Sequence, residues 1–560
     1  MPYSIHQRPQ LLSRLRTEVF DLLVVGGGIT GAGIARDAAL RGLKVALVER
    51  GDFSIGTSSR STKLIHGGLR YLEMGDVGLV FEAVRERQRL MLLAPHLARP
   101  QSFVLPVQKH VKHSVLMLDI GLTVYDFLAS FAGVMHHRAV RTKALLRMEP
   151  RLRAEGLSGG VRYFDATTND TRLVLANIRG AVEAGAVALS RVSFVEPRLK
   201  ENKLKGATVR DELTGELMPV ATQVVIAAAG PWTDEFMGRW KGSASMPALR
   251  PSKGVHVVVP RARLPLTHAV TMTSPLDGRV VFALPWPHAT VLGTTDTAYD
   301  GPLDEPGCTW DDAHYLVETA NGCLSPVGDP LTVSDIVSTW SGIRPLVAQT
   351  GASVYKTSRE HIITTDPRGL VAIAGGKLTT YRVMAEQTVD EAIKLLPATR
   401  AAELKPPSTQ TLPLPGATNF ASKQRPLQQV ALDLTAAGVD KDWAQHLADN
   451  YGSDAPQVVE NCRTIDQGMD LAIPELPWRI GELAWLTREE MALDLVDLCV
   501  RRTQLYYSAG DALIAHAPRL ANLLAQWCDW PAERTRGLAD QLVDYIVNHR
   551  VAAREIADAA

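Results

Sequence analysis

Residues 21–50 constrain the fold more than any other part of the chain, because they read as one complete β-α-β unit. An apolar run of strand length at 22–25 leads into a turn with three glycines in the pattern G-x-G-x-x-G. Residues 29–40 are compatible with a helix, and a second apolar strand at 45–48 ends at Glu49. Strand, glycine turn, helix, strand and acid in this order are typical of a doubly wound α/β fold.

The glycine turn predicts a site for the pyrophosphate of a dinucleotide. Its first glycine permits the tight turn, its second lets backbone approach the phosphates, and its third lets the helix pack closely on the strand. The helix N-terminus then directs N–H groups and the positive end of its dipole at the phosphates. Glu49 stands where a carboxylate accepts a hydrogen bond from a ribose hydroxyl. The cofactor contacts expected from this unit are Gly26, Gly28, Gly31 and Glu49.

Length and composition narrow the class of protein. A chain of 560 residues is long enough for roughly two to four domains. Its formal net charge is zero, so the composition gives no indication of a basic surface that binds nucleic acid. The five cysteines form no C-x-x-C pair, so we expect neither a metal site nor a disulfide framework. We therefore expect the protein to work in a reducing compartment. No run of about 20 apolar residues predicts a membrane-spanning helix, although contact with a membrane surface stays open.

Residues 57–71 form a second region of interest, because they combine small hydroxyl side chains, a lysine, a histidine, two glycines and an Arg-Tyr pair. The two adjacent glycines beside His66 suggest backbone that passes close to a ligand. A plain surface loop has a similar composition, but we favour ligand contact. The expected cofactor contacts here are Ser58, Ser59, Lys63, Leu64, His66 and Gly67, and the expected substrate contacts are Arg70 and Tyr71.

A third region, at 369–386, reads as a buried strand, a pair of glycines and a long helix. A helix N-terminus that carries a lysine suits an electron-rich group. Its position far downstream of the first unit implies a discontinuous cofactor domain with insertions. An apolar strand at 223–229 also runs into a glycine that suits an approach to the cofactor. The expected cofactor contacts are Gly230, Gly376, Lys377, Leu378 and Thr379, of which Lys377 and Thr379 also serve the substrate.

Together these regions resemble the FAD-dependent glycerol-3-phosphate dehydrogenases over nearly the whole chain. The matching stretches are 26–33, 63–71, 229–232, 253–256, 293–296, 341–345 and 375–381. The first is shared by many flavoproteins, whereas 63–71 and 375–381 are far more specific. One departure is Asn169, which stands where the family usually has the first of consecutive acids, while Asp170 is retained. The role of that first acid is therefore open here.

The resemblance implies an α/β chain, α+β overall, with three parts. These are a glutathione-reductase-like FAD-binding Rossmann domain, an inserted substrate domain on antiparallel strands, and an all-helical C-terminal cap domain. The expected bounds are 18–95, 150–240 and 345–400 for the FAD domain, 96–149 and 241–344 for the substrate domain, 401–416 for a linker and 417–560 for the cap. Within the cap, residues 487–490 match a capping box and so predict a helix start.

The resemblance also implies an activity: oxidation of glycerol 3-phosphate to dihydroxyacetone phosphate by hydride transfer to FAD, with electrons passed to membrane quinone. The implied partners are glycerol 3-phosphate, quinone and a lipid bilayer surface, with no nucleic acid, and a homodimer stays open. The implied location is cytoplasmic, peripherally associated with the inner face of the membrane.

The chemistry of the residues agrees with this substrate class. A small dianion needs several cations, and arginine offers bidentate contacts to phosphate. Arg70, Arg344 and Lys377 all lie in glycine-rich contexts, so we expect them to converge. Oxidation of a secondary alcohol also needs a base, because the flavin takes only the hydride. His66 and His256 are the candidate bases, and Arg344 is the third catalytic candidate.

Other functions stay open at this point. An oxidase that reduces oxygen to peroxide shares these motifs, but its relatives tend to carry an insertion that is not obvious here. A flavin-binding sensor or scaffold predicts loss of the Arg, Lys and His set, which is present. An amino-acid-oxidising flavoenzyme would need one carboxylate clamp rather than several phosphate cations. A dehydrogenase that uses only nicotinamide has no use for the region at 369–386.

Overall fold

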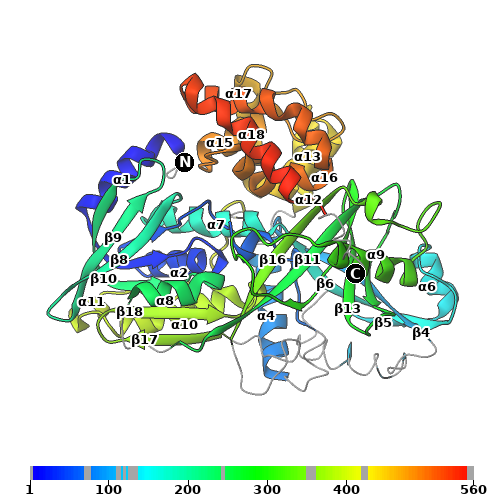
Figure 1. Ribbon diagram of the computed structural model, residues 1–560, viewed down its shortest axis with the longest axis horizontal. Helices are drawn as coiled ribbons and strands as arrows, with labels where there is room; N and C mark the ends of the chain where they lie inside the picture. Colours follow the sequence, from blue (N-terminus) through cyan, green and yellow to red (C-terminus); the bar gives the residue numbers. More distant parts are fainter. Residues whose placement is uncertain are drawn as a thin grey trace, which may run out of the picture.

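The computed structural model describes residues 4–68, 77–108, 136–240, 246–347, 361–417 and 427–551, together with 115, 117, 122 and 123. These residues form two sheets and a C-terminal helical block (residues 427–551) that lies over the edges of both sheets (Figure 1). None of the helices in this part of the chain is long and apolar enough to cross a bilayer.

The first sheet has eight strands and carries the predicted β-α-β unit. Its central strands are parallel, and both of their faces are covered, so they consist of continuous apolar runs. In spatial order its main path is β17 (His361–Asp366), β18 (Leu370–Gly375), β10 (Leu217–Ala227), β1 (Val19–Val25), β2 (Val45–Val48) and β7 (Val187–Leu189). β8 (Val192–Lys200) and β9 (Lys203–Asp211) extend it beside β10.

Helices α2 (Ile29–Leu40), α7 (Asp170–Glu183) and α10 (Tyr381–Ile393) pack side by side against this sheet. The chain passes from β1 to β2 on one side, whereas β10 and β18 join the other side of β1. The order of strands therefore reverses at β1, which is where doubly wound sheets bind ligands. The predicted fold class is confirmed by this arrangement.

The second sheet has ten strands and is mostly antiparallel. Its main path is β15 (Thr297–Ala298), β11 (Leu249–Pro260), β14 (Ala289–Gly293), β13 (Val280–Pro285), β12 (Ala269–Thr273), β4 (Ala98–Gln108), β6 (Leu157–Thr168) and β3 (Leu64–Ile65). β16 (Ser338–Val347) pairs with β11, and β5 (Arg138–Val140) pairs with β6. β3 and β6 thus belong to this sheet, although the expected division gives their residues to the FAD domain. The domain bounds stay a prediction.

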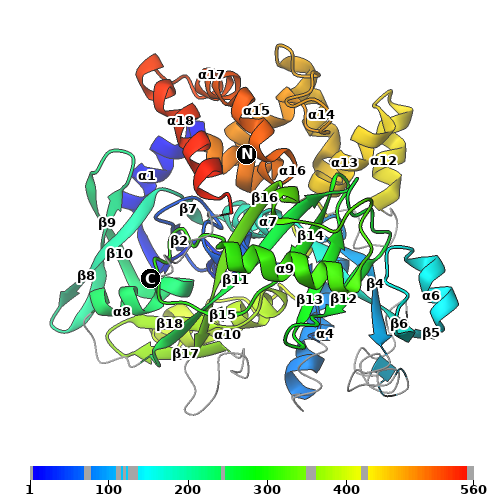
Figure 2. The same cartoon turned by 45° about the vertical axis from the view of Figure 1, so that its right-hand side comes forward.

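The helical block lies over the second sheet (Figure 2). Its buried apolar side chains form a core that continues onto that sheet. Its elements are α12 (Leu427–Ala436), α13 (Lys441–Tyr451), η7 (Gly452–Asp454), α14 (Ala455–Thr464), α15 (Ile480–Glu489), η8 (Asp497–Arg502), α16 (Leu505–Ala509), η9 (Gly510–His516), α17 (Ala517–Trp527) and α18 (Ala532–Asn548). The predicted helix start at 487–490 is wrong, because these residues end α15. At the start of α15 the Glu482 carboxylate instead accepts the backbone N–H of Arg479 at 3.0 Å.

The remaining elements are helices and 3-10 turns outside the two sheets and the helical block. The helices are α1 (Arg8–Thr17), α4 (Val77–Leu93), α6 (Thr142–Met148), α8 (Thr233–Trp240), α9 (Trp310–Cys323) and α11 (Ala398–Ala401). The 3-10 turns are η1 (Ile5–Gln7), η2 (Thr57–Ser59), η3 (Gly230–Trp232), η4 (Val333–Asp335) and η6 (Leu378–Thr380).

His96 is a buried titratable group close to the helical block. A β-carbon added to Gly416 would lie 2.7 Å from its Nε2 atom, so the ring packs directly against that glycine. Burial, followed by the positive charge of Arg172, lowers the pKa of His96 from 6.5 to about 3. The folded protein therefore holds this imidazole neutral over a range in which the unfolded chain protonates it.

The lowered pKa of His96 predicts that acid reduces the stability of the folded protein. Between pH 6.5 and about 3 the unfolded chain binds a proton that the folded protein does not, so acidification favours unfolding. We expect His96→Gln to reduce the fall in melting temperature between about pH 6.5 and 4.5. His6→Gln, at an exposed histidine, serves as the control and should keep the wild-type slope. Identical slopes for wild type and His96→Gln would contradict the prediction.

Candidate active site

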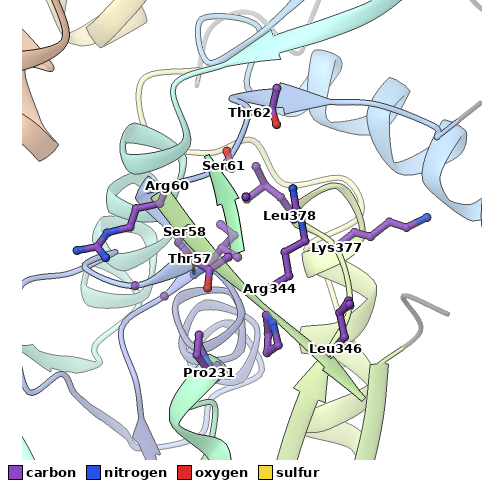
Figure 3. Close-up of a pocket in the computed structure, with 18 of the residues that line it drawn as sticks. Thr57, Ser58, Arg60, Ser61, Thr62, Pro231, Arg344, Leu346, Lys377 and Leu378 are labelled. Carbon is purple, nitrogen blue, oxygen red and sulfur yellow. Dashed lines mark hydrogen bonds between the residues drawn. The ribbon is translucent and has the colours of Figure 1, made fainter. Parts of the chain in front are cut away.

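A cavity of about 900 Å³ lies between the two sheets, at the upper end of the usual range for ligand sites. Its wall combines the glycine turn after β1, the stretch around η2, the inner strands of the second sheet and the turn after β18. Figure 3 shows that side chains from these distant segments surround one space. The cavity therefore lies at the reversal point of the parallel sheet and is closed by the antiparallel one.

The glycine turn leaves no room for side chains. A β-carbon at Gly26 would lie 2.4 Å from the Ala228 carbonyl oxygen, and one at Gly31 would lie 1.9 Å from the Gly26 carbonyl oxygen. Gly26 and Gly28 line the cavity. Gly31 does not line it, so its part is the close packing of α2 on the turn.

The N-terminus of α2 opens toward the cavity. The first N–H groups of a helix have no acceptor within the helix, and here the N–H of Ile29 donates to Ser58 Oγ at 2.9 Å. A β-carbon at Gly28 would lie 3.1 Å from the same oxygen. Bare backbone, a helix N-terminus and a hydroxyl on one cavity wall are the features that fit a pyrophosphate.

Glu49 is buried on the same wall. Its carboxylate accepts hydrogen bonds from the N–H groups of Gly27, at 2.7 Å, and Gly51, at 2.8 Å. Burial raises the pKa of Glu49, and these two backbone donors act in the opposite direction. The acid is thus fixed between the glycine turn and the next loop, where a ribose contact is expected.

Lys63 does not line the cavity in this structure, and its contact with the cofactor stays a prediction. Its ammonium group is buried, pairs with Asp170 at 2.6 Å and donates to the Ser59 carbonyl at 3.0 Å. The ion pair joins the 57–66 stretch to the start of α7. Ser59, Lys63 and Gly67 all lie behind the wall, whereas Ser58, Leu64 and His66 are on it.

Asn169 explains the departure from the family pattern. Its side-chain oxygen accepts the N–H of Arg172 at 3.1 Å and so caps α7. The same oxygen accepts a hydrogen bond from Gln504 of the helical block at 3.1 Å. Asparagine caps helices as well as aspartate does, so an uncharged residue is sufficient here. Asp170 carries the contact to Lys63.

His66 connects two regions that are remote in sequence. Its backbone N–H donates to Thr379 Oγ1, and that hydroxyl donates to the His66 carbonyl, both at 3.2 Å. His66, Lys377, Leu378 and Thr379 all line the cavity, and so do Gly230 and Gly376. The two most specific sequence regions therefore border one site.

His256 lies on β11 and is only 2 % exposed. Its Nε2 atom is 2.9 Å from Thr62 Oγ1, and its ring stacks on Trp340 at 4.7 Å between centroids. Burial, followed by the positive charge of Arg344, lowers the pKa of His256 well below its ordinary value. Its Nδ1 atom has no hydrogen-bond partner within the described part of the chain. The ring is therefore neutral.

Arg344 is held in a fixed orientation on β16. It pairs with Asp296 at 3.0 Å and donates to Thr294 Oγ1 at 3.0 Å and to the Thr295 carbonyl at 3.1 Å. A β-carbon at Gly254 would lie 2.3 Å from its Nη2 atom, so a larger residue there would displace the guanidinium.

Two of the three cations that were predicted to converge lie on the cavity wall. Arg344 and Lys377 line the same cavity, but Figure 3 shows their side chains extending in different directions. Arg70 and Tyr71 lie outside the described residues. The three-cation clamp therefore stays a prediction, with Arg344 as its best-oriented member.

Sequence reasoning missed two groups on the wall. Asp296 orients Arg344, and the Arg50 guanidinium lies 4.4 Å from the ring centre of Trp232. Asp296 ends the motif 293–296, and Arg50 directly follows Glu49. Both positions could have been singled out because they lie in or beside a motif. Their partners, however, are distant in sequence and come together only in the folded structure.

The fold and the site define the class of protein: a dinucleotide-binding oxidoreductase with a second sheet over its cofactor cavity. Residues 21–382 match the family model of FAD dependent oxidoreductases, and residues 407–535 match that of the C-terminal domain of alpha-glycerophosphate oxidase. The aerobic glycerol-3-phosphate dehydrogenase of Staphylococcus aureus strain MRSA252 is 36% identical over 539 residues, 95% of each chain. The chain therefore belongs to the family of FAD-dependent glycerol-3-phosphate dehydrogenases, and its cofactor is FAD.

Solved structures agree with this assignment. The glycerol-3-phosphate dehydrogenase from Bacillus halodurans complexed with FAD matches with a TM-score of 0.80 and 30% identity over 98% of both chains. The L-alpha-glycerophosphate oxidase from Mycoplasma pneumoniae matches with a TM-score of 0.53 and 18% identity. That match covers 68% of this chain and 95% of the oxidase, and it concerns the fold alone.

Gly28 offers a direct test of the cofactor wall. We expect Gly28→Val to purify without FAD, because the new side chain would meet Ser58 and occupy the space of the pyrophosphate. The ratio of flavin to protein absorbance measures the loss. Gly537→Val is the control, since a β-carbon there meets nothing within 4 Å. A Gly28→Val protein with a full complement of FAD would show that the site is misplaced.

Proposed function

We propose that this protein oxidises sn-glycerol 3-phosphate to dihydroxyacetone phosphate, with hydride transfer to FAD. The observation that carries the proposal is the pairing of a buried neutral histidine, His256, with an oriented cation, Arg344, in the cofactor cavity. The two residues lie on the adjacent strands β11 and β16, so their spacing is set by the sheet. A substrate with a hydroxyl near one end and a phosphate at the other suits such a pair.

Different residues act on different parts of the substrate during the oxidation. Flavin supplies the acceptor for the hydride, which leaves C2 with both electrons of the C–H bond. His256 accepts the hydroxyl proton as the new C=O bond forms, and its neutral state makes it available for that step. Arg344 binds the phosphate through the geometry that suits arginine. His66 is the second candidate for the base, because it lines the same cavity.

We also propose that the electrons pass to a membrane quinone and that the protein binds peripherally to the cytoplasmic face of the membrane. The relatives that match over 95% of the chain are named dehydrogenases and not oxidases, which favours an acceptor other than oxygen. The match of residues 407–535 to a domain named for an oxidase favours oxygen as a second candidate. The two candidates differ only in where the electrons go.

Turnover experiments separate them. Purified holoprotein is given glycerol 3-phosphate with either a quinone in lipid vesicles or oxygen, and dihydroxyacetone phosphate and peroxide are measured. We expect product with quinone and little peroxide with oxygen. Peroxide in a one-to-one ratio to product would establish the oxidase. No product with either acceptor would contradict the proposed substrate.

A further inference from the structure

A buried ion cluster links the helical block to the loop that follows Glu49. Asp52 is fully buried, three positions after Glu49, and it accepts a bidentate contact from Arg502, at 2.6 and 2.8 Å. Arg501 adds a third contact to Asp52, at 2.6 Å. Both arginines belong to η8, the π-helical turn of the block. The loop at 49–54 is thus held by residues that lie 449 and 450 positions away from Asp52 in sequence.

The same turn holds the other side of the loop. Arg191, between β7 and β8, donates to Asp497 of η8 at 2.8 and 3.0 Å. Its backbone N–H donates to the Gly51 carbonyl at 2.8 Å. Although burial raises the pKa of Asp497, the charges of Arg191 and Arg501 hold it well below its usual range. Asp497 is therefore ionised, and η8 contacts the loop directly through Asp52 and on its other side through Arg191.

The loop in turn shapes the cofactor wall. Glu49 accepts the N–H groups of Gly27 and Gly51, and the N–H of Ser54 donates to the Gly27 carbonyl at 3.0 Å. Ser54 has a φ of 67°, a conformation that a serine rarely adopts. A displacement of Asp52 would consequently move the backbone on both sides of the glycine turn.

We propose that η8 is a positioning element for FAD: through Arg501, Arg502 and Asp52 it holds the 49–54 loop in the conformation that binds the cofactor. The helical block then has a task in cofactor retention besides its packing. Other ion pairs also attach the block, such as Arg179 on α7 with Asp454 of η7, but this pair does not touch the loop. It provides a control for the loss of an ion pair that attaches the block without contacting the loop.

The test is the rate at which FAD leaves the folded protein, followed by the rise in free-flavin fluorescence well below the unfolding transition. We expect Arg502→Gln to accelerate FAD loss by about tenfold or more, because a buried carboxylate loses its bidentate partner. Arg179→Gln should lower the melting temperature without changing the rate of FAD loss. An Arg502→Gln protein that keeps the wild-type rate would overturn the proposal, as would equal acceleration by both variants.

Asp52→Asn is a second variant for the same measurement, for use if Arg502→Gln does not fold. It preserves the shape of the side chain, removes its charge and replaces one acceptor oxygen with an NH2 donor that the arginines cannot bind, so the loop loses its ionic contact with η8. We expect faster FAD loss here as well, with a visible flavin spectrum that changes as the loop shifts. A folded Asp52→Asn protein with the wild-type spectrum and rate of FAD loss would overturn the proposal.

Discussion

His256→Phe is expected to lower kcat for glycerol 3-phosphate by about 10²–10⁴-fold, the usual contribution of a general base. Phenylalanine preserves the stacking on Trp340 and the apolar packing, so the protein should keep its FAD. Both ring nitrogens disappear, and with them the acceptor for the hydroxyl proton. The rate of flavin reduction under anaerobic single-turnover conditions measures the chemical step directly.

His66→Phe is the matched comparison, because His66 lines the same cavity. If His66→Phe abolishes reduction and His256→Phe leaves it within tenfold of wild type, the roles are reversed. The pKa of His256 lies well below its ordinary value, so this residue stays neutral as pH falls through 6.5. Acidification from about pH 8 to 6 should therefore not switch the base off by protonating it.

Arg344→Met is expected to raise KM for glycerol 3-phosphate by about 10- to 100-fold. A charge-assisted contact to phosphate contributes roughly 1.5–3 kcal/mol, which corresponds to one to two decades of affinity. Methionine fills the space of the alkyl chain but offers no donor. Steady-state kinetics with glycerol 3-phosphate and with glycerol separate the phosphate contact from other effects.

Glycerol provides the control because it has the hydroxyl groups and no phosphate. We expect the rate with glycerol to change little in Arg344→Met. An equal loss with both substrates would mean that Arg344 serves the fold or the flavin, and the phosphate contact would be abandoned. Flavin content must be measured in the same preparations, since Arg344 also orders Asp296 and Thr294.

Local patterns predicted the parts of the fold that depend on neighbouring residues. The β-α-β unit follows from adjacent apolar runs and three glycines, whose close contacts the structure confirms. The capping box at 487–490 failed because the same residue types also end a helix, and only packing of α15 decides between the two. A local pattern is reliable when a single conformation satisfies it.

Long-range pairing explains what the sequence could not predict. Lys63 lies in a specific motif, yet its charge is bound by Asp170, more than a hundred positions later. Arg344 was expected to bind phosphate, but the orienting role of Asp296 depends on strands that meet through β11. Residue type and context therefore indicated the chemistry, whereas the partner that neutralises or orients each charge required the tertiary structure.

The most direct test of the central claim is the visible flavin absorbance of the holoprotein during anaerobic addition of substrate. We predict that stoichiometric glycerol 3-phosphate bleaches the flavin and yields dihydroxyacetone phosphate, whereas glycine, the substrate type of an amino-acid-oxidising flavoenzyme, does not. Flavin that stays oxidised with excess glycerol 3-phosphate, or that is bleached by glycine instead, would contradict the account.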